Sequence, residues 1–147
     1  MKEKFIYDKI VPGDFMKLIV CLDDKNGIAF NGRRQSRDRV VSERIVDLSK
    51  GGKLFMNEYS AKIFQSDLKV VDNDFLTKAE AGDFCFCEDD SFLLYLGKIT
   101  RLIVYRWNKA YPRDKVINAD VFYGKTIKSR CDFVGNSHER ITEEVYE

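Results

Sequence analysis

Arginine is concentrated in one short stretch of the sequence. Residues 31–39 (NGRRQSRDR) contain Arg33, Arg34, Arg37 and Arg39, with Asp38 as the only acid among them. Guanidinium groups bind phosphate or carboxylate groups through paired hydrogen bonds. Because cations this close repel one another unless an anion lies between them, the stretch predicts a local binding site for an anionic ligand.

A second polar cluster follows the short apolar segment that ends at Met56. It combines an amide, an aromatic ring, a hydroxyl group at an expected helix start and a cation, which together could stack a base and hold a phosphate. The two clusters define the predicted ligand site, which consists of Arg33, Arg34, Gln35, Arg37, Asp38, Asn57, Tyr59, Ser60 and Lys62. The alternative is an exposed, solvated arginine loop that Asp38 and Glu43 partly neutralise.

The other residues that could do chemistry are four cysteines, Cys21, Cys85, Cys87 and Cys131, and one histidine, His138. Cys85 and Cys87 alternate along a strand pattern and share one face, so with Cys131 and His138 they could in principle bind zinc. Zinc sites usually separate such a pair by two or more residues, and all the cysteines lie in or beside apolar strand patterns. Buried, reduced thiols and no bound metal are therefore expected.

The single histidine, His138, follows Asn136-Ser137 where a hairpin turn is expected. A general base needs a nucleophile and an orienting acid beside it, and the sequence identifies neither for this histidine. The simpler prediction is an exposed turn histidine. Tyr105 and Trp107 are expected in the core rather than as stacking platforms for a ligand.

The overall composition limits the classes of function. The chain has 147 residues, a formal net charge of +1 and 44% hydrophobic residues, which fits one globular domain of ordinary core size. The balanced charge and the lack of a basic stripe do not favour nucleic acid as a partner. No stretch is apolar enough for a membrane span and the first residues lack the apolar core of a secretion signal, so a cytoplasmic protein is predicted. The oligomeric state stays open, with a homo-oligomer among the possibilities.

Apolar periodicity and turn residues divide the chain into alternating strands and helices. Residues 1–15 end at Pro12-Gly13 and are predicted to be an appendage to a single domain over 16–147. Strands are predicted over 17–22, 53–56, 69–72, 83–87 and 101–107, a turn over 23–32, helical segments over 37–49, 60–64, 74–79 and 92–96, and a hairpin of 126–133 with 138–146. Ser36 or Asp38 would cap the first helix, and Ser60 the second. This order predicts an α/β sheet that is parallel inside and antiparallel at one edge, with the arginine loop at the carboxyl ends of the strands.

One stretch has a more specific pattern. Asp23-Asp24-Lys25-Asn26-Gly27-Ile28-Ala29-Phe30-Asn31-Gly32, directly after the first apolar strand, resembles the loop motif D-x-N-x-G-I-G-x-N-G of dihydrofolate reductases. Leu54-Phe55-Met56 stands where that family has a short strand before a nucleotide-binding helix, and the terminal hairpin agrees in position. The similarity in order covers residues 16–146. It implies an α/β fold with a dihydrofolate-reductase-like mixed sheet, flanking helices and a C-terminal antiparallel hairpin.

The resemblance stops at the residues that serve the reductase reaction in that family. Its Leu-Pro-Trp is replaced by Arg33-Arg34-Gln35-Ser36, its phosphate-binding G-R-x-T by Asn57-Glu58-Tyr59-Ser60, and its late Gly-Gly pair by Glu88-Asp89-Asp90. Asp38 stands close to the place of the family's pteridine-binding acid, but out of register. An acidic run repels phosphate and adds Cβ atoms where glycine lets the backbone approach it. The sequence therefore predicts no NADPH, no other cofactor and no hydride transfer.

The chain also resembles small bacterial and phage proteins that carry a ribonuclease Z label, but it lacks the H-x-H-x-D-H run with which ribonuclease Z binds its metal ions. We therefore expect non-catalytic binding of a small phosphorylated, nucleotide-derived ligand in a dihydrofolate-reductase-like cleft. A phage sponge that sequesters a cyclic-nucleotide immune signal, as an anti-defence protein, is the specific hypothesis. The alternatives are a divergent reductase or nucleotide-processing enzyme with Asp38 as its acid, and an interaction protein whose arginine loop contacts an acidic partner.

Overall fold

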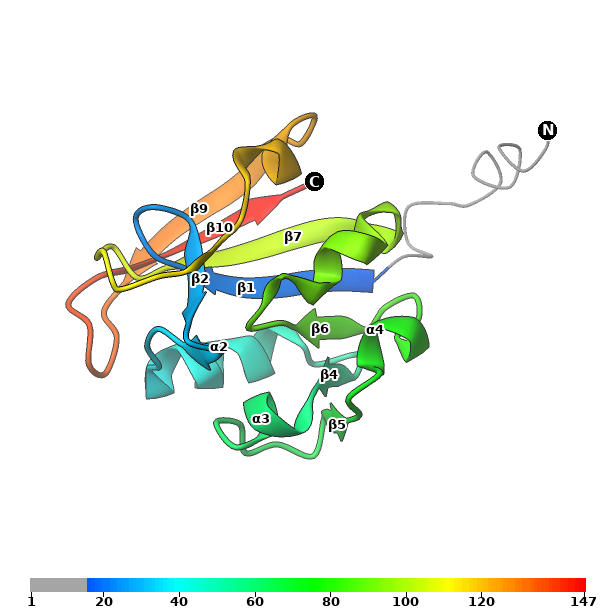
Figure 1. The fold of residues 1–147 in the computed structure, drawn as a ribbon. Helices are drawn as coiled ribbons and strands as arrows, with labels where there is room; N and C mark the ends of the chain where they lie inside the picture. Colours follow the sequence, from blue (N-terminus) through cyan, green and yellow to red (C-terminus); the bar gives the residue numbers. More distant parts are fainter. Residues whose placement is uncertain (1–15) are drawn as a thin grey trace.

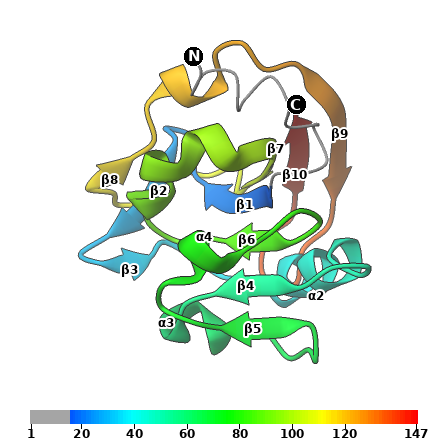
Figure 2. The same ribbon diagram turned by 90° about the vertical axis from the view of Figure 1, so that its right-hand side faces the viewer.

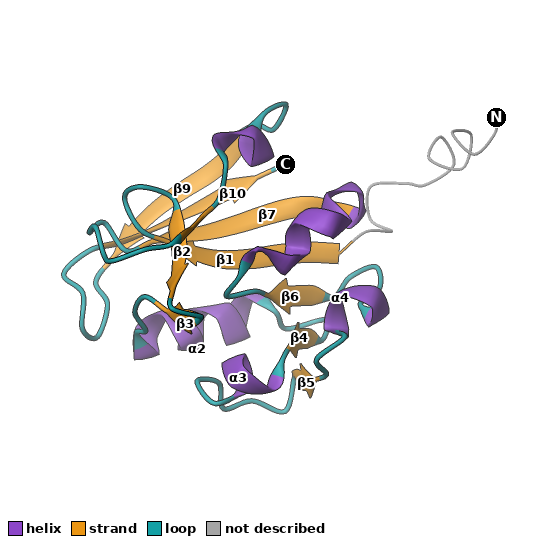
Figure 3. Cartoon of the chain, in the orientation of Figure 1, coloured by secondary structure: helices purple, strands orange, loops and turns teal. Residues whose placement is uncertain are grey.

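The computed structural model describes residues 16–147, and the predicted appendage over 1–15 lies outside the described residues. The strands are β1 (Met16–Leu22), β2 (Gly27–Phe30), β3 (Arg33–Arg34), β4 (Leu54–Met56), β5 (Lys69–Val71), β6 (Phe84–Phe86), β7 (Ile99–Arg106), β8 (Lys115–Val116), β9 (Ile127–Phe133) and β10 (Ile141–Tyr146). The helices are α2 (Arg39–Leu48), α3 (Glu58–Ala61) and α4 (Phe75–Lys78), and the 3-10 helices are η2 (Asp90–Lys98) and η3 (Ala119–Phe122). Figure 1 shows the chain from its blue first strand to its red last one, and Figure 3 shows the helices placed around the strands.

Seven strands form one sheet in the order β5-β4-β6-β1-β7-β10-β9. The strands from β5 to β7 in this order run parallel to one another, β10 pairs antiparallel with β7, and β9 pairs antiparallel with β10. Figure 2 shows β5, β4, β6 and β1 rising in succession, with β10 and β9 beyond them. The predicted mixed sheet, parallel inside and closed by a C-terminal antiparallel hairpin, is confirmed.

Each face of this sheet is covered by its own apolar cluster, because successive residues of a strand point to opposite faces. On one face, Leu18 of β1 packs with Phe75 of α4 and Phe92 of η2. On the other face, Ile19 of β1 packs with Ile45 of α2. The face that α2 covers also carries the site described below.

Helix α2 begins after Asp38, which is one of its two predicted caps. The Asp38 carboxylate accepts hydrogen bonds from the main-chain N–H groups of Val40 and Val41. The helix buries Val41 and Ile45 against the sheet, as the apolar spacing predicts. At 10 residues it is the longest α-helix described, and no helix within residues 16–147 is long and apolar enough to cross a membrane.

Helix α3 differs from its prediction at the start. It begins at Glu58, and its cap is Asn57, whose Oδ1 accepts a hydrogen bond from the N–H of Ser60 at 2.8 Å. The predicted cap at Ser60 is therefore wrong. The physical reason is that Asn57, directly after β4, is itself a strong cap and starts the helix earlier.

A second, three-stranded sheet of order β3-β2-β8 lies beside the first. The sequence predicts only a turn over 23–32, and Asn26 and Asn31 do have turn-like φ angles of 61° and 53°. Between these two residues, however, β2 pairs with β3 and with the distant β8. The pattern does not predict this sheet because β3 and β8 are only two residues long. Its consequence is that the start of the arginine loop is a strand.

Candidate functional site

The carboxyl ends of the parallel strands meet at one edge of the large sheet. Asp23 follows β1, Asn57 follows β4, Glu88 lies shortly after β6, and Trp107 follows β7. The arginine loop reaches this edge, because Arg34 borders the same small cavity as Glu88 and Trp107. Ligands of open α/β sheets bind at this edge.

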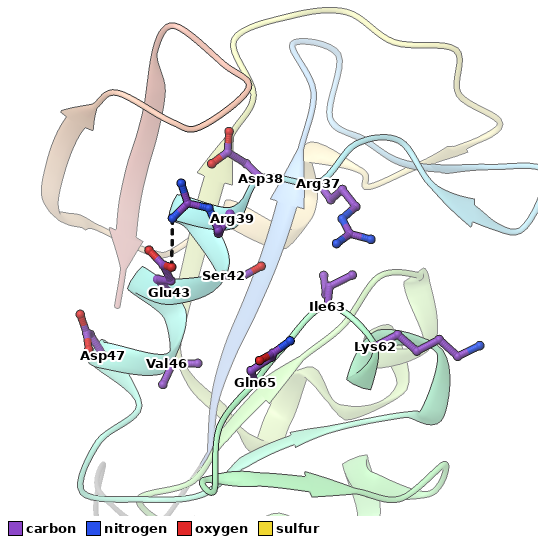
Figure 4. Close-up of a pocket in the computed structure, with 10 residues that line it drawn as sticks. All are labelled: Arg37, Asp38, Arg39, Ser42, Glu43, Val46, Asp47, Lys62, Ile63 and Gln65. Carbon is purple, nitrogen blue, oxygen red and sulfur yellow. Dashed lines mark hydrogen bonds and ion pairs between the residues drawn. The ribbon is translucent and has the colours of Figure 1, made fainter.

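A cleft of about 460 Å³ lies between α2 and the turn that follows α3, and Figure 4 shows the side chains around it. We call it the α2–α3 cleft. It is lined by Arg37, Asp38, Arg39, Ser42, Glu43, Val46, Asp47, Lys62, Ile63 and Gln65. Arg37, Asp38 and Lys62 of the predicted site are therefore brought together here.

Two cations of this cleft carry a charge that the described chain does not neutralise. The exposed side chains of Arg37 and Lys62 form no hydrogen bond or ion pair with any residue of 16–147. Figure 4 shows Arg37 on the loop before α2 and Lys62 on the turn after α3, with the Lys62 side chain extending away from α2. The cleft therefore has two positive charges available to a ligand.

The remaining charges of the cleft are paired. Arg39 lies 3.2 Å from Glu43 and also donates a hydrogen bond of 2.9 Å to Asn136 Oδ1. Asp47 pairs with Lys50 at 3.1 Å. These pairs are exposed and weak in energy, and Arg37 and Lys62 remain as the cations of the cleft without a partner, next to the buried carboxylate of Asp38.

Arg34 is not the exposed residue that the sequence predicts. Its side chain is 17% exposed and donates two hydrogen bonds to Glu88, from Nε to Oε2 at 2.7 Å and from Nη2 to Oε1 at 2.9 Å. Its guanidinium carbon also lies 4.1 Å from the centre of the Tyr59 ring. The expectation of an exposed, unpaired arginine is wrong at this position because the acid that neutralises it comes from the end of another strand.

The second predicted cluster is mostly bonded within the protein. Ser60 is buried, and its Oγ donates a hydrogen bond to Glu88 Oε1 at 2.7 Å. Asn57 caps α3, and the Tyr59 hydroxyl accepts a hydrogen bond from the N–H of Arg34 at 3.1 Å. Lys62 is the member of this cluster that lines the α2–α3 cleft.

Arg33 and Gln35 line a separate open hollow of about 450 Å³, together with Phe30, Asn31, Arg34 and Pro112. Gln35 Nε2 donates hydrogen bonds to Asp23 Oδ2 at 3.0 Å and to the Pro112 carbonyl at 3.2 Å. Gln35 Oε1 is buried and has no hydrogen-bond partner in the described part of the chain. Six of the nine predicted residues are thus divided between two hollows, and Asn57, Tyr59 and Ser60 line neither of them.

Asp38 borders the cleft, but its carboxylate is bonded to the loop before β10. It accepts hydrogen bonds from the N–H groups of Asn136 and Ser137, both at 2.8 Å, and lies 2.9 Å from His138 Nδ1. Burial alone would raise the pKa of Asp38, but these bonds outweigh it and hold the pKa well below its usual range. A Cβ atom at Gly135 would lie 2.5 Å from Asp38 Oδ2, so only glycine lets the loop come this close. An acid this stable in its ionised form is a poor proton donor.

His138 is buried, so the prediction of an exposed turn histidine is wrong. Its ring stacks on Trp107 with the centroids 4.6 Å apart. Its Nε2 lies 3.1 Å from Ser36 Oγ and 2.9 Å from Tyr111 Oη. Sequence reasoning missed Ser36 and Tyr111, because Ser36 and His138 are 102 residues apart. The sequence offers one signal for this group. Ser36 and Asp38 are separated by a single residue, and His138 is the one histidine that could bond to both.

A small cavity of about 10 Å³ extends the cleft inward to Ser36. Space of this size holds about one water molecule. The cavity shares several wall residues with the outer cleft, namely Arg37, Asp38, Ser42 and Ile63. Phe64, Phe86 and Trp107 close its inner side, so the ligand space beside the sheet is narrow.

The cysteines are free thiols. Cys85 and Cys87 are buried as predicted, Cys21 is half-buried, and Cys131 is exposed on β9, where the prediction of burial is wrong. Burial raises the pKa of the Cys85 thiol to about 12 and also raises that of Cys87, which makes both unreactive. Within residues 16–147, no three His, Cys, Asp or Glu side chains form a group that could hold a metal ion.

Comparisons with known proteins identify the fold but not a family. No protein-family model matches the sequence, and no curated protein matches it. Among solved structures, the chain is similar to a dihydrofolate reductase from Enterococcus faecalis in complex with NADP(H) and RAB-propyl, with a TM-score of 0.63 and 8% sequence identity. The match covers 90% of this chain and 95% of the reductase chain. The protein therefore has a dihydrofolate-reductase-like fold.

Proposed function

We propose that the α2–α3 cleft binds a small phosphorylated molecule derived from a nucleotide. The observation that carries this proposal is the pair of cations, Arg37 and Lys62, which line the cleft without a partner in the described chain. An anion between them would gain charge-assisted hydrogen bonds. Arginine would hold a phosphate through two parallel bonds, and lysine would add a point charge from the other side.

The size and surface of the cleft fit such a molecule. Its volume of about 460 Å³ lies within the range of roughly 300–1,000 Å³ that small-molecule pockets occupy. Val46 and Ile63 add apolar surface beside the charges, which suits the face of a base or sugar next to its phosphate. The dihydrofolate-reductase-like fold supports a cleft at this edge of the sheet.

Capture without chemistry is the simplest form of this function, and sequestration of a cyclic-nucleotide signal by a phage protein is its specific form. If the protein only sequesters its ligand, denaturation should release that ligand chemically unchanged. Small molecules released from the purified protein are identified by mass spectrometry, and a thermal-shift screen covers nucleotides, cyclic di- and trinucleotides and ADP-ribose derivatives. An intact nucleotide with a matching thermal shift supports capture. No nucleotide and no shift would reject the proposal and favour an acidic partner protein.

The variant Arg37→Ala assigns binding to this cleft. Loss of a charge-assisted bond worth about 1.5–3 kcal/mol should raise Kd roughly tenfold to a hundredfold. The matched control is Lys128→Ala, which removes an exposed cation on β9, outside the cleft, and should leave Kd unchanged. Calorimetric titration with the nucleotide that gives the largest thermal shift measures Kd for the wild type and both variants. Equal affinities would contradict the assignment to this cleft.

A further inference from the structure

Ser36, His138 and Asp38 lie in hydrogen-bond contact, one after the other, at the inner end of the α2–α3 cleft. Ser36 Oγ lies 3.1 Å from His138 Nε2, and His138 Nδ1 lies 2.9 Å from Asp38 Oδ2. A hydroxyl group, an imidazole and an orienting carboxylate in this order carry out acyl transfer on several unrelated folds. Anion binding by Arg37 and Lys62 does not require this arrangement.

Asp38 determines which nitrogen of His138 faces Ser36 as a base. The N–H groups of Asn136 and Ser137 donate to the Asp38 carboxylate, which is therefore an acceptor for His138 as well. The imidazole proton then lies on Nδ1, and Nε2 presents its lone pair to Ser36 Oγ. Stacking on Trp107 at 4.6 Å fixes the plane of the ring.

Tyr111 provides a second hydroxyl group at the same nitrogen. Its Oη lies 2.9 Å from His138 Nε2. The single lone pair of Nε2 accepts one strong hydrogen bond, so the hydroxyl groups of Tyr111 and Ser36 compete for it. Removal of the Tyr111 hydroxyl should therefore make His138 more available to Ser36, whereas a purely structural network would only be weakened.

The surroundings of Ser36 restrict what can react with it. The adjoining cavity of about 10 Å³ admits only a small acyl group, of about one or two carbons. The main-chain N–H groups of Ser36 and Arg37 donate no hydrogen bond within residues 16–147, so neither is committed to another acceptor of the described chain. The Arg37 side chain extends into the outer cleft, where it can hold an anionic group of the same substrate.

We propose that Ser36 is a nucleophile and that the protein hydrolyses small carboxylic esters of phosphorylated compounds. Ser36 Oγ attacks the carbonyl carbon of the ester while its proton passes to His138 Nε2. The bond from this carbon to the alcohol oxygen breaks, and the alcohol leaves with the proton from Nε2, so the acyl group stays on Ser36. Water then attacks the acyl group and gives a proton to Nε2, the acid is released, and Nε2 returns the proton to Ser36 Oγ. Asp38 is a positioning residue that stabilises the imidazolium.

The nature of the substrate rests on the proposed anion binding, but the reactivity of Ser36 does not. A phosphorylated ligand without an ester would be held by the cleft and released unchanged. A phosphorylated ligand with a small acyl group near its phosphate would be cleaved. The two parts of the proposal therefore need separate tests.

The nucleophile is tested with methanesulfonyl fluoride, because this reagent is small and neutral and does not depend on Arg37 or Lys62. The folded protein is treated, and the modified residue is located by tandem mass spectrometry. Sulfonylation of Ser36, with no modification of Ser42 in the same cleft, is the expected result. Ser36→Ala should keep the melting temperature and lose the modification. Absence of modification at Ser36 in the folded wild type overturns the proposal.

The role of the histidine is tested by the rate of this modification in two variants. His138→Gln should lower the rate of Ser36 sulfonylation about 10²–10⁴-fold, which is the usual contribution of a general base. Tyr111→Phe should raise it. Circular dichroism verifies that both variants are folded. If His138→Gln is sulfonylated as fast as the wild type, the assignment of His138 as the base is overturned. If His138→Gln does not fold, a slower sulfonylation of Tyr111→Phe than of the wild type overturns the assignment.

The substrate class is tested with O-acetylated and O-butyrylated nucleoside monophosphates. The acetyl esters should be hydrolysed and the butyryl esters should not, and Arg37→Ala should raise the KM of the acetyl esters. Reactive Ser36 without hydrolysis of any nucleotide ester would overturn the substrate class and leave the nucleophile standing. Nucleotide binding with an unreactive Ser36 would overturn the nucleophile and leave the proposed binding function standing.

Discussion

Arg34 and Arg37 belong to one loop but have opposite environments. Arg34 is 17% exposed and donates two hydrogen bonds to Glu88, which neutralises it. Arg37 is exposed, and its side chain has no partner in the described residues. The difference arises because the end of β6 lies beside the first arginine and supplies an acid, whereas the second faces the α2–α3 cleft. Clustered positive charge therefore predicts an anion site only where no acid of the fold already pairs with it.

The largest effect on stability should come from Arg34, the arginine that Glu88 neutralises. Arg34→Ala leaves Glu88, whose side chain is 11% exposed, without its cation, and should lower the free energy of unfolding by about 3 kcal/mol. Urea denaturation monitored by circular dichroism measures this loss. The control is Arg33→Ala in the same loop, because Arg33 is exposed and its loss should cost less than about 0.5 kcal/mol. Equal stabilities of the two variants would remove the distinction between the arginines.

A smaller loss is expected for Asp38, the acid next to Arg37. Asp38→Asn keeps one oxygen that can cap α2, but it replaces the other oxygen by a donor NH2 group and removes the charge on the bonds to Asn136, Ser137 and His138, at a cost of about 2 kcal/mol at neutral pH. Because the folded pKa of Asp38 is lowered, the unfolded chain binds its proton first as the pH falls. The stabilisation should therefore be complete above the unfolded pKa of about 3.9 and decline as the pH falls below it.

Denaturation of wild type and Asp38→Asn at neutral pH and at pH ~3 measures this dependence on the Asp38 charge. The difference between the two proteins should shrink in acid. A difference that is the same at both pH values would show that the ionised carboxylate is not what stabilises the loop.

Substitution of Arg37, the arginine whose side chain has no partner in residues 16–147, should have almost no effect on stability. Arg37→Ala removes an exposed charge with no partner in residues 16–147, so the free energy of unfolding should change by less than about 0.5 kcal/mol in the absence of ligand. Urea denaturation again provides the measurement. A loss as large as that of Arg34→Ala would mean that Arg37 stabilises the fold rather than a ligand.

We expect no measurable binding of NADPH to the protein. Glu88 places a carboxylate shortly after β6, where the sequence comparison places the glycine pair of the reductases, and its bonds to Arg34 and Ser60 hold it there. The Glu88 side chain fills space where glycine would let the main chain approach a pyrophosphate group, and the exposed carboxylate of the neighbouring Asp89 repels that group. Titration that follows the fluorescence of NADPH should show no binding in the micromolar range. Micromolar binding, or reduction of dihydrofolate, would restore a reductase function.

The frame of the fold could be predicted from the sequence because its strands are local apolar runs. The patterns at 17–22 and 101–107 correspond to β1 and β7 at the centre of the sheet, and Asp38 caps α2 through contacts with near neighbours. The contacts that form the site could not be predicted in this way. Arg34 and Glu88 are 54 residues apart, and Asp38 and His138 are 100 residues apart. Such contacts depend on which strands are neighbours in the sheet, and periodicity along the chain does not contain that information.

The bonds of Asp38 to Asn136, Ser137 and His138 also have a consequence for the order in which the protein is made. A chain emerges from the ribosome from its amino end, so α2 is synthesised long before the residues that complete its cap. The contact between Asp38 and His138 closes a loop of 100 residues, and contacts of such long range form late because the loop entropy must be lost first. A nascent chain can therefore form α2 early, with the local bonds of Asp38 to the N–H groups of Val40 and Val41. The inner end of the α2–α3 cleft, with Ser36 and its partners, forms only after the last hairpin has been translated.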